Sequence, residues 1–131
     1  MKKTLAIFFI FLSSYCFTQT KAPKEYLDLI HRAESFFLEK KFQASALAYS
    51  AAFKKGKYKI YSFDFYNAGC AWALSGNSDS AFVNLYRIVN PGVYTDYTHI
   101  TNDFDLISLH QDKRWLPLVK TVLKNGQLKG K

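Results

Sequence analysis

The sequence predicts an all-α protein built from stacked helical hairpins, and three observations support this. Shifting the chain by 36 residues lays one helix-pair pattern on another, so that Ala33 falls on Gly69 and Phe36 falls on Trp72. Apolar side chains recur at three- and four-residue steps in both halves, which is the period of an amphipathic helix. The composition, 49% hydrophobic with 6 glycines and 3 prolines in 131 residues, fits one compact domain. A repeat slightly longer than 34 residues is typical of stacked helix pairs.

The first half of the repeat, about residues 24–57, is expected to form two helices joined at Lys40-Lys41. Gly56 is expected to end the second helix, because glycine is common just past a helix end. Two apolar stripes define the helices, one made of Leu27, Ile30, Ala33, Phe37 and Leu38, the other of Phe42, Ala46, Tyr49, Ala52 and Phe53.

The second half, about residues 60–92, shows the same pattern. Ser75-Gly76-Asn77 is the expected turn, and Asn90-Pro91-Gly92 is expected to end the last helix. Asn77 or Ser78 is placed to cap that helix, with Asp79 near the positive end of its dipole. Its two stripes are made of Phe63, Tyr66, Gly69, Ala73 and Leu74, and of Ala81, Phe82, Leu85, Ile88 and Val89.

The period fails beyond Gly92, where the segment from Tyr94 to Asn102 is expected to be an ordered loop. A closing element of helical segments is predicted at about residues 100–125, with Pro117 tolerated only near a helix start. Residues 126–131 are expected to form a flexible basic tail. The closing element offers a set of apolar side chains that would cover the last hairpin, as a terminal repeat requires: Leu106, Leu109, Trp115, Leu118, Val119 and Val122.

The N-terminal residues 1–18 have the composition of a secretory signal peptide. Two lysines precede an apolar run at residues 5–12, which is too short for the roughly 20 residues of a membrane-spanning helix. Cleavage is expected near Thr18-Gln19, leaving a helical domain over residues 19–125 in the periplasm or outside the cell. A retained anchor and lipidation at Cys16 are the alternatives, the latter disfavoured by a bulky tyrosine just before the cysteine.

The run Tyr66-Asn67-Ala68-Gly69-Cys70-Ala71-Trp72, followed by Gly76 and Ala81, resembles a tetratricopeptide repeat (TPR). The first unit is a weaker match, because Lys40 stands where that pattern has a turn glycine and Lys57 stands where it has a closing proline. The resemblance implies two antiparallel helix hairpins stacked as a short right-handed solenoid.

The end of the chain adds to this resemblance. The segment Asp103-Phe104-Asp105-Leu106, followed by Arg114-Trp115, is similar to the closing element often seen after TPR-like units in exported bacterial proteins. It implies that C-terminal helical segments close the solenoid.

The TPR resemblance also implies a peptide-binding groove, with Asn67 holding the backbone of an extended peptide through its amide. Two alternatives remain open: Asn67 bonds only a neighbouring helix while Phe37 and Tyr66 belong to the core, or the C-terminal element fills the groove. The groove positions that the resemblance implies are Ile30, His31, Glu34 and Phe37 in the first unit, and Tyr66, Asn67, Cys70 and Ala73 in the second.

Metal and nucleophilic chemistry are less well supported by the residue patterns. Asp103, Asp105, His110 and Asp112 lie close together in sequence, yet they match neither the spacing of calcium loops nor that of zinc sites. Helix capping by the aspartates and pairing of one aspartate with Arg114 are favoured instead. No catalytic motif occurs, and Cys70 lies in an apolar stretch typical of an inert, buried thiol.

The sequence therefore predicts a non-catalytic, exported helical-repeat module that binds a protein or peptide and needs no cofactor. Nucleic acid is not an expected partner, and the cluster of Lys54, Lys55, Lys57 and Lys59 is expected to form a solvated loop. Two other functions stay open: a small metal-dependent or hydrolytic protein that uses the Asp103, Asp105 and His110 region, or an accessory domain of an exported hydrolase system.

Overall fold

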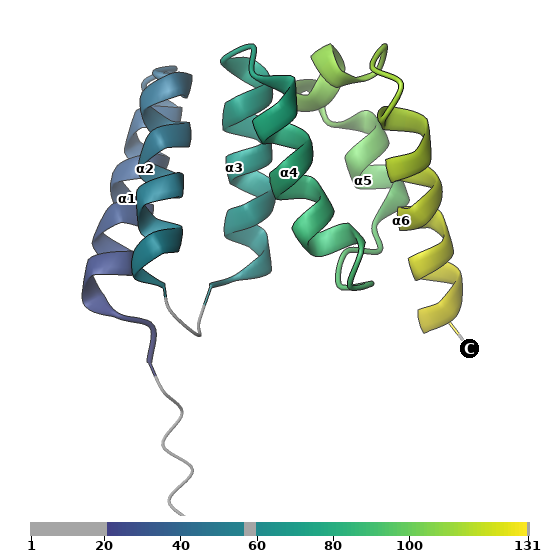
Figure 1. Cartoon of the computed structure of the whole chain (residues 1–131), viewed down its shortest axis with the longest axis horizontal. Helices are drawn as coiled ribbons and strands as arrows, with labels where there is room; N and C mark the ends of the chain where they lie inside the picture. Colours follow the sequence, from purple (N-terminus) through teal and green to yellow (C-terminus); the bar gives the residue numbers. More distant parts are fainter. Residues whose placement is uncertain (1–20, 57–59, 131) are drawn as a thin grey trace, which may run out of the picture.

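The computed structural model describes residues 21–56 and 60–130, and this part of the chain is all-helical, as predicted. Two helix hairpins lie side by side and are followed by the closing helices (Figure 1). No helix in the described part is long and apolar enough to cross a membrane. The elements are α1 (Lys24–Leu38), α2 (Phe42–Lys55), α3 (Ser62–Leu74), α4 (Ser78–Val89), α5 (Tyr97–Asn102), the 3-10 helix η1 (Phe104–Leu109) and α6 (Trp115–Lys129).

Some sequence-based expectations lie outside the described residues. The predicted signal peptide at residues 1–18, including Cys16, is one of these, and so are Lys57 and Lys59 of the basic cluster. They remain predictions.

The turn of the first hairpin places a lysine in the left-handed backbone region. Lys40 has a φ of 57°, where a side chain crowds the neighbouring carbonyl oxygen and glycine is favoured. The Lys40 N–H donates to the Phe37 carbonyl at 2.9 Å, and the Lys41 N–H donates to the Phe36 carbonyl at 2.8 Å. These bonds satisfy carbonyl groups at the end of α1 and close the helix in a Schellman turn.

The turn of the second hairpin has the same bonds, with glycine in the left-handed position. Gly76 has a φ of 83°, and its N–H donates to the Ala73 carbonyl at 3.1 Å. The Asn77 N–H donates to the Trp72 carbonyl at 2.9 Å. Each donor and acceptor lies 36 positions after its counterpart in the first turn, so the shift found in the sequence also relates the two turns in the structure.

Small residues allow the helices of each hairpin to pack closely. A Cβ atom on Gly69 would lie only 2.9 Å from Leu85 Cδ2 and 3.5 Å from the Ala81 carbonyl oxygen. In the first hairpin Ala33 is fully buried, and its carbonyl accepts a hydrogen bond from Ser45 Oγ at 2.8 Å. Ala33 and Gly69, which the 36-residue shift relates, therefore both lie where the two helices of their hairpin approach each other.

The two hairpins are joined by a buried polar contact and by shared aromatic packing. The Tyr26 hydroxyl of α1 donates to the buried carboxylate of Asp64 on α3, and it accepts from the Tyr61 N–H at 3.2 Å. Burial raises the pKa of both Tyr26 and Asp64. The partly buried rings of Trp72 and Phe37 pack against the cores of both hairpins.

The closing element covers the second hairpin as predicted. Its six predicted cover residues are all buried, and they form one apolar cluster with Phe82 and Leu85 of α4. Asp103 caps η1 by accepting the Asp105 N–H at 2.9 Å. α6 begins at Trp115, which leaves Pro117 in its first turn, where proline is tolerated.

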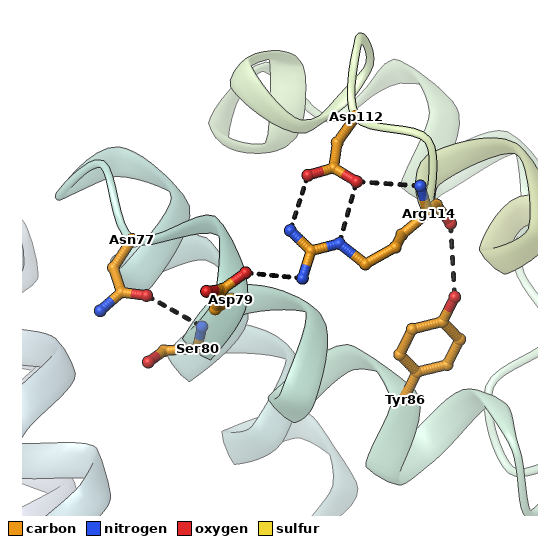
Figure 2. Close-up of polar contacts among 6 residues, drawn as sticks. All are labelled: Asn77, Asp79, Ser80, Tyr86, Asp112 and Arg114. Atoms are coloured by element: carbon orange, nitrogen blue, oxygen red, sulfur yellow. Dashed lines mark hydrogen bonds and ion pairs between the residues drawn. The ribbon is translucent and has the colours of Figure 1, made fainter.

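Arg114 links the closing element to α4 (Figure 2). Its guanidinium donates to both carboxylate oxygens of Asp112, at 2.9 and 2.6 Å, and to Asp79 at 2.7 Å. It also lies 4.4 Å from the centroid of the Phe82 ring. The Arg114 hydrogen bonds lower the pKa of Asp112 to about 2. The predicted pairing of an aspartate with Arg114 is confirmed, with Asp112 as the partner. Of the two predicted N-cap residues, Asn77 is the one that caps α4, and its side chain accepts the Ser80 N–H at 2.9 Å.

Two expectations about the C-terminal region differ from the structure. The segment predicted as a loop contains α5, because Asp96 caps a short helix by accepting the His99 N–H at 2.8 Å. Residues 126–129, predicted as a flexible tail, continue α6. The Asn125 amide anchors this last stretch by donating to the Val89 and Tyr94 carbonyls at 2.8 and 3.1 Å.

The two hairpin turns predict opposite changes in stability when glycine is introduced at position 40 and when it is replaced by alanine at position 76. Lys40→Gly should stabilise the protein by about 0.5 to 1 kcal/mol, because it removes the crowding of a left-handed side chain. Gly76→Ala should destabilise it by about 1 kcal/mol for the same reason. Urea denaturation of both variants checks this, and destabilisation by Lys40→Gly would show that the lysine turn is not strained.

The contact at Gly69 predicts non-additive mutations. Gly69→Ala should cost about 1 to 3 kcal/mol through overpacking against Leu85, and Leu85→Ala should cost about 2 to 5 kcal/mol through a cavity. The double variant should lose less than the sum, because the added methyl group enters the space that leucine leaves. Strict additivity in denaturation measurements would place Gly69 away from Leu85.

Candidate binding groove

A cavity of about 400 Å³ opens where the first hairpin, α3 and the closing element meet, and we call it the groove. Three parts of the chain contribute to it. Its lining consists of Glu34, Phe37 and Leu38 from α1, Tyr49 from α2, Phe63, Tyr66, Asn67 and Cys70 from α3, and His99, Asp103 and Asp105 from the closing region.

The structure brings together five of the eight residues that the TPR resemblance implies for a groove: Glu34, Phe37, Tyr66, Asn67 and Cys70. The other three lie elsewhere. Ile30 and Ala73 are buried and do not line the cavity, whereas Tyr66 and Cys70 are buried to the same degree but form part of its wall. His31 is exposed but does not line the cavity.

Two apolar residues at the groove are exposed, although the helical stripes predicted them to be buried. Leu38 is 84% exposed and Phe63 is 64% exposed. Leu38 is the last residue of α1 and Phe63 is the second residue of α3, so each lies at a helix end, where the facing helix no longer covers it. Phe104, beside Asp103 and Asp105, is also 83% exposed. The groove therefore has an apolar, accessible rim.

Stacked aromatic rings form one wall of the groove. The Tyr66 ring stacks on Tyr94 and His99, with centroid distances of 5.2 and 5.1 Å. The Tyr94 hydroxyl lies 2.6 Å from His99 Nδ1 in a hydrogen bond. Burial raises the pKa of the Tyr94 hydroxyl to about 12, so it stays protonated at neutral pH. This stack holds α5 against α3.

Asp103 fixes the closing element to α3. Its Oδ2 atom accepts the Tyr66 hydroxyl at 2.7 Å and lies 3.8 Å from the Cys70 sulfur, while its Oδ1 atom accepts the Asp105 N–H. Burial, and next the bond to Asp103, raise the pKa of Tyr66. Both carboxylate oxygens of Asp103 are thus occupied by donors of the protein itself.

Asp105 differs from Asp103 because its carboxylate has neither a hydrogen-bond donor nor a cationic partner within residues 21–56 and 60–130. The side chain is partly buried and lines the groove. Burial raises its pKa, and the neighbouring Asp103 charge raises it further. An ionised Asp105 is consequently held at some cost, which a cation in the groove would relieve.

The residues of the metal-site alternative are only partly brought together. Cys70, Asp103 and Asp105 offer ligand atoms within 4.8 Å of one another. His110 does not join them, since its ring stacks on Trp115 at a centroid distance of 4.3 Å. Burial raises the pKa of the Cys70 thiol, which favours the protonated form and argues against a nucleophilic role.

A second cavity, of about 530 Å³, has a lining of apolar and charged side chains. Its charged residues are Lys54, Arg87 and Asp79, and the Arg87 guanidinium lies 5.1 Å from the centroid of the Phe65 ring. The Asn84 amide, also at this cavity, donates to the Ser80 carbonyl at 2.8 Å. The groove, whose lining holds three carboxylates and neither lysine nor arginine, is therefore the more acidic of the two.

Comparison with family models, with curated proteins and with solved structures finds no match to this chain. The class is therefore defined by the molecule alone. It is an all-helical protein of two packed hairpins and a closing helical element, with an acidic, aromatic groove where these parts meet.

The environment of Asp105 predicts a pH-dependent stability difference. A carboxyl group whose pKa is raised by folding stabilises the fold below its unfolded pKa, and this contribution is lost as the pH rises through the folded pKa. Asp105→Asn should therefore increase stability at pH 7 by about 0.2 to 1 kcal/mol, with the difference vanishing at low pH.

Thermal or urea unfolding across pH 3 to 8 measures this effect. Asp28→Asn is the matched control, because Asp28 is an exposed residue that pairs with Lys24 and should give no gain. Loss of stability in Asp105→Asn at pH 7 would indicate a structural role for this carboxylate.

Proposed function

We propose that this protein is a non-catalytic helical-repeat module that binds an extended segment of another protein in the groove. The two hairpins would stack as a short right-handed solenoid, in the manner of tetratricopeptide repeats. The observation that carries the proposal is the groove itself. Its lining combines two exposed apolar residues, Leu38 and Phe63, with carboxylate, amide and aromatic groups.

The apolar rim argues for a macromolecular partner. Large apolar side chains gathered at a concave surface are typical of interaction sites, because covering them releases ordered water. Leu38 and Phe63 lie on different helices, α1 and α3, so a ligand that covers both would cross the junction between the two hairpins. An extended peptide has the shape for this.

Asn67 provides a polar group suited to hold such a peptide. It is partly exposed in the groove. It also lies near Tyr49, whose pKa is raised to about 12, chiefly by burial, while the Asn67 amide acts in the opposite direction and lowers that pKa. An amide offers both a donor and an acceptor, which is what a peptide backbone unit requires. Asn67→Ala should therefore weaken binding while leaving most of the folding free energy in place.

We place this binding role outside the cytoplasm, on the basis of the predicted signal peptide at residues 1–18. N-terminal sequencing of the protein recovered from its source tests this part separately. A mature chain that begins near Gln19 supports export, and an intact N-terminus in an intracellular fraction contradicts it.

Selection from a phage-displayed library of random nonapeptides on the immobilised protein tests the binding role. Enriched peptides, measured by fluorescence anisotropy, should bind the groove. Leu38→Ser should weaken them about tenfold, which corresponds to about 1.4 kcal/mol of lost apolar contact.

Leu128→Ser is the matched control, because Leu128 is 62% exposed near the end of α6 and does not line the groove. It should leave affinity unchanged. Failure to enrich any peptide, or equal loss in both variants, would contradict a binding role for the groove.

A further inference from the structure

Within residues 21–56 and 60–130, the acidic residues of the groove have no cationic partner. The chain has 10 acidic residues and a formal net charge of +8, so bases are abundant. Five acidic residues form ion pairs in the described part of the chain, Asp64 bonds Tyr26, and Asp96 caps α5. The remaining three, Glu34, Asp103 and Asp105, all line the groove.

Of these three, Asp105 is the one whose carboxylate is partly buried and accepts no hydrogen bond from the described residues. Asp103 already accepts hydrogen bonds on both oxygens. Glu34 is exposed on α1, on the side of the groove formed by the first hairpin. The groove therefore presents two carboxylates from different elements, and a cation between them would gain from both charges.

The surroundings favour a cation on an organic side chain. The Phe37 and Tyr49 rings line the same cavity, and aromatic faces attract guanidinium and ammonium groups. A metal ion would find a poorer site, since both carboxylate oxygens of Asp103 already accept hydrogen bonds. Nucleic acid is disfavoured, because its phosphates would be repelled by the acidic lining.

We propose that the groove, in the binding role proposed above, takes a peptide segment in which one arginine or lysine is flanked by apolar residues. The basic side chain pairs with Asp105 and Glu34. Its apolar neighbours cover Leu38 and Phe63 at the rim. This inference rests on the proposed function and names the chemistry of its ligand.

The nonapeptide selection also decides this point. Peptides enriched on the wild-type protein should carry an arginine or lysine at one fixed position between apolar residues. The same selection on Asp105→Asn should lose that basic preference. Asp28→Asn, which removes the same charge outside the groove, should keep it.

A synthetic peptide from the enriched pool then measures the charge contribution. Replacing its arginine with citrulline, which keeps the shape and removes the charge, should weaken binding to the wild-type protein at least about tenfold. The same replacement should have little effect on binding to Asp105→Asn. Added salt should weaken the arginine peptide more than the citrulline peptide.

The outcomes separate the two proposals. Enriched peptides without a basic preference would overturn the ligand chemistry while leaving the binding role intact, whereas no enrichment would overturn the binding role itself. Sedimentation equilibrium tests whether a second copy of this chain occupies the groove. A wild-type dimer that dissociates in Asp105→Asn would show that the second copy supplies the cation, and this result would overturn the proposal of a separate partner.

Discussion

The close contact between Gly69 and Leu85 is the constraint on which the rest of the structure depends. Glycine lets α4 approach α3 closely at this point, since a Cβ atom would lie 2.9 Å from Leu85 Cδ2 and would force the leucine side chain to shift. With Gly69 turned toward α4, the helical period places Asn67 and Phe63 on the other side of α3, where they line the groove. One packing contact thus orients both the core face and the groove-lining face of the helix.

The closing element stabilises the fold and also completes the groove. Arg114 joins it to α4 through Asp79, and Asp103 joins it to α3 through Tyr66. That second contact occupies one acidic residue of the groove and places Asp105, two positions later, where no donor or cation of the described residues pairs with its carboxylate. Asp103 therefore stabilises the fold, whereas Asp105 is the residue that we propose binds the ligand's cation, and its unpaired charge lowers stability in the way that functional residues often do.

The hairpins could be predicted from the sequence because local chemistry determines them. Glycine at residue 76, the Asn77 cap and the three- and four-residue apolar steps act within one or two helical turns, and the 36-residue shift repeats them. The groove could be predicted only in part. Exposure of Leu38 and Phe63 depends on where the facing helix ends, and Asp105 joins the groove because Asp103 bonds Tyr66, 37 residues away in sequence. The apolar periodicity of the sequence shows neither where a facing helix ends nor which distant residues form a contact.

The most direct test of this architecture is a nuclear Overhauser spectrum of the protein in solution. The account predicts cross-peaks from the Gly69 α-protons to the Leu85 methyl groups, and between the rings of Tyr66 and His99, which stack at 5.1 Å. Together they report the helix contact and the assembled groove. Absence of the first contact, with both residues assigned and the protein folded, would contradict the hairpin arrangement from which the groove follows.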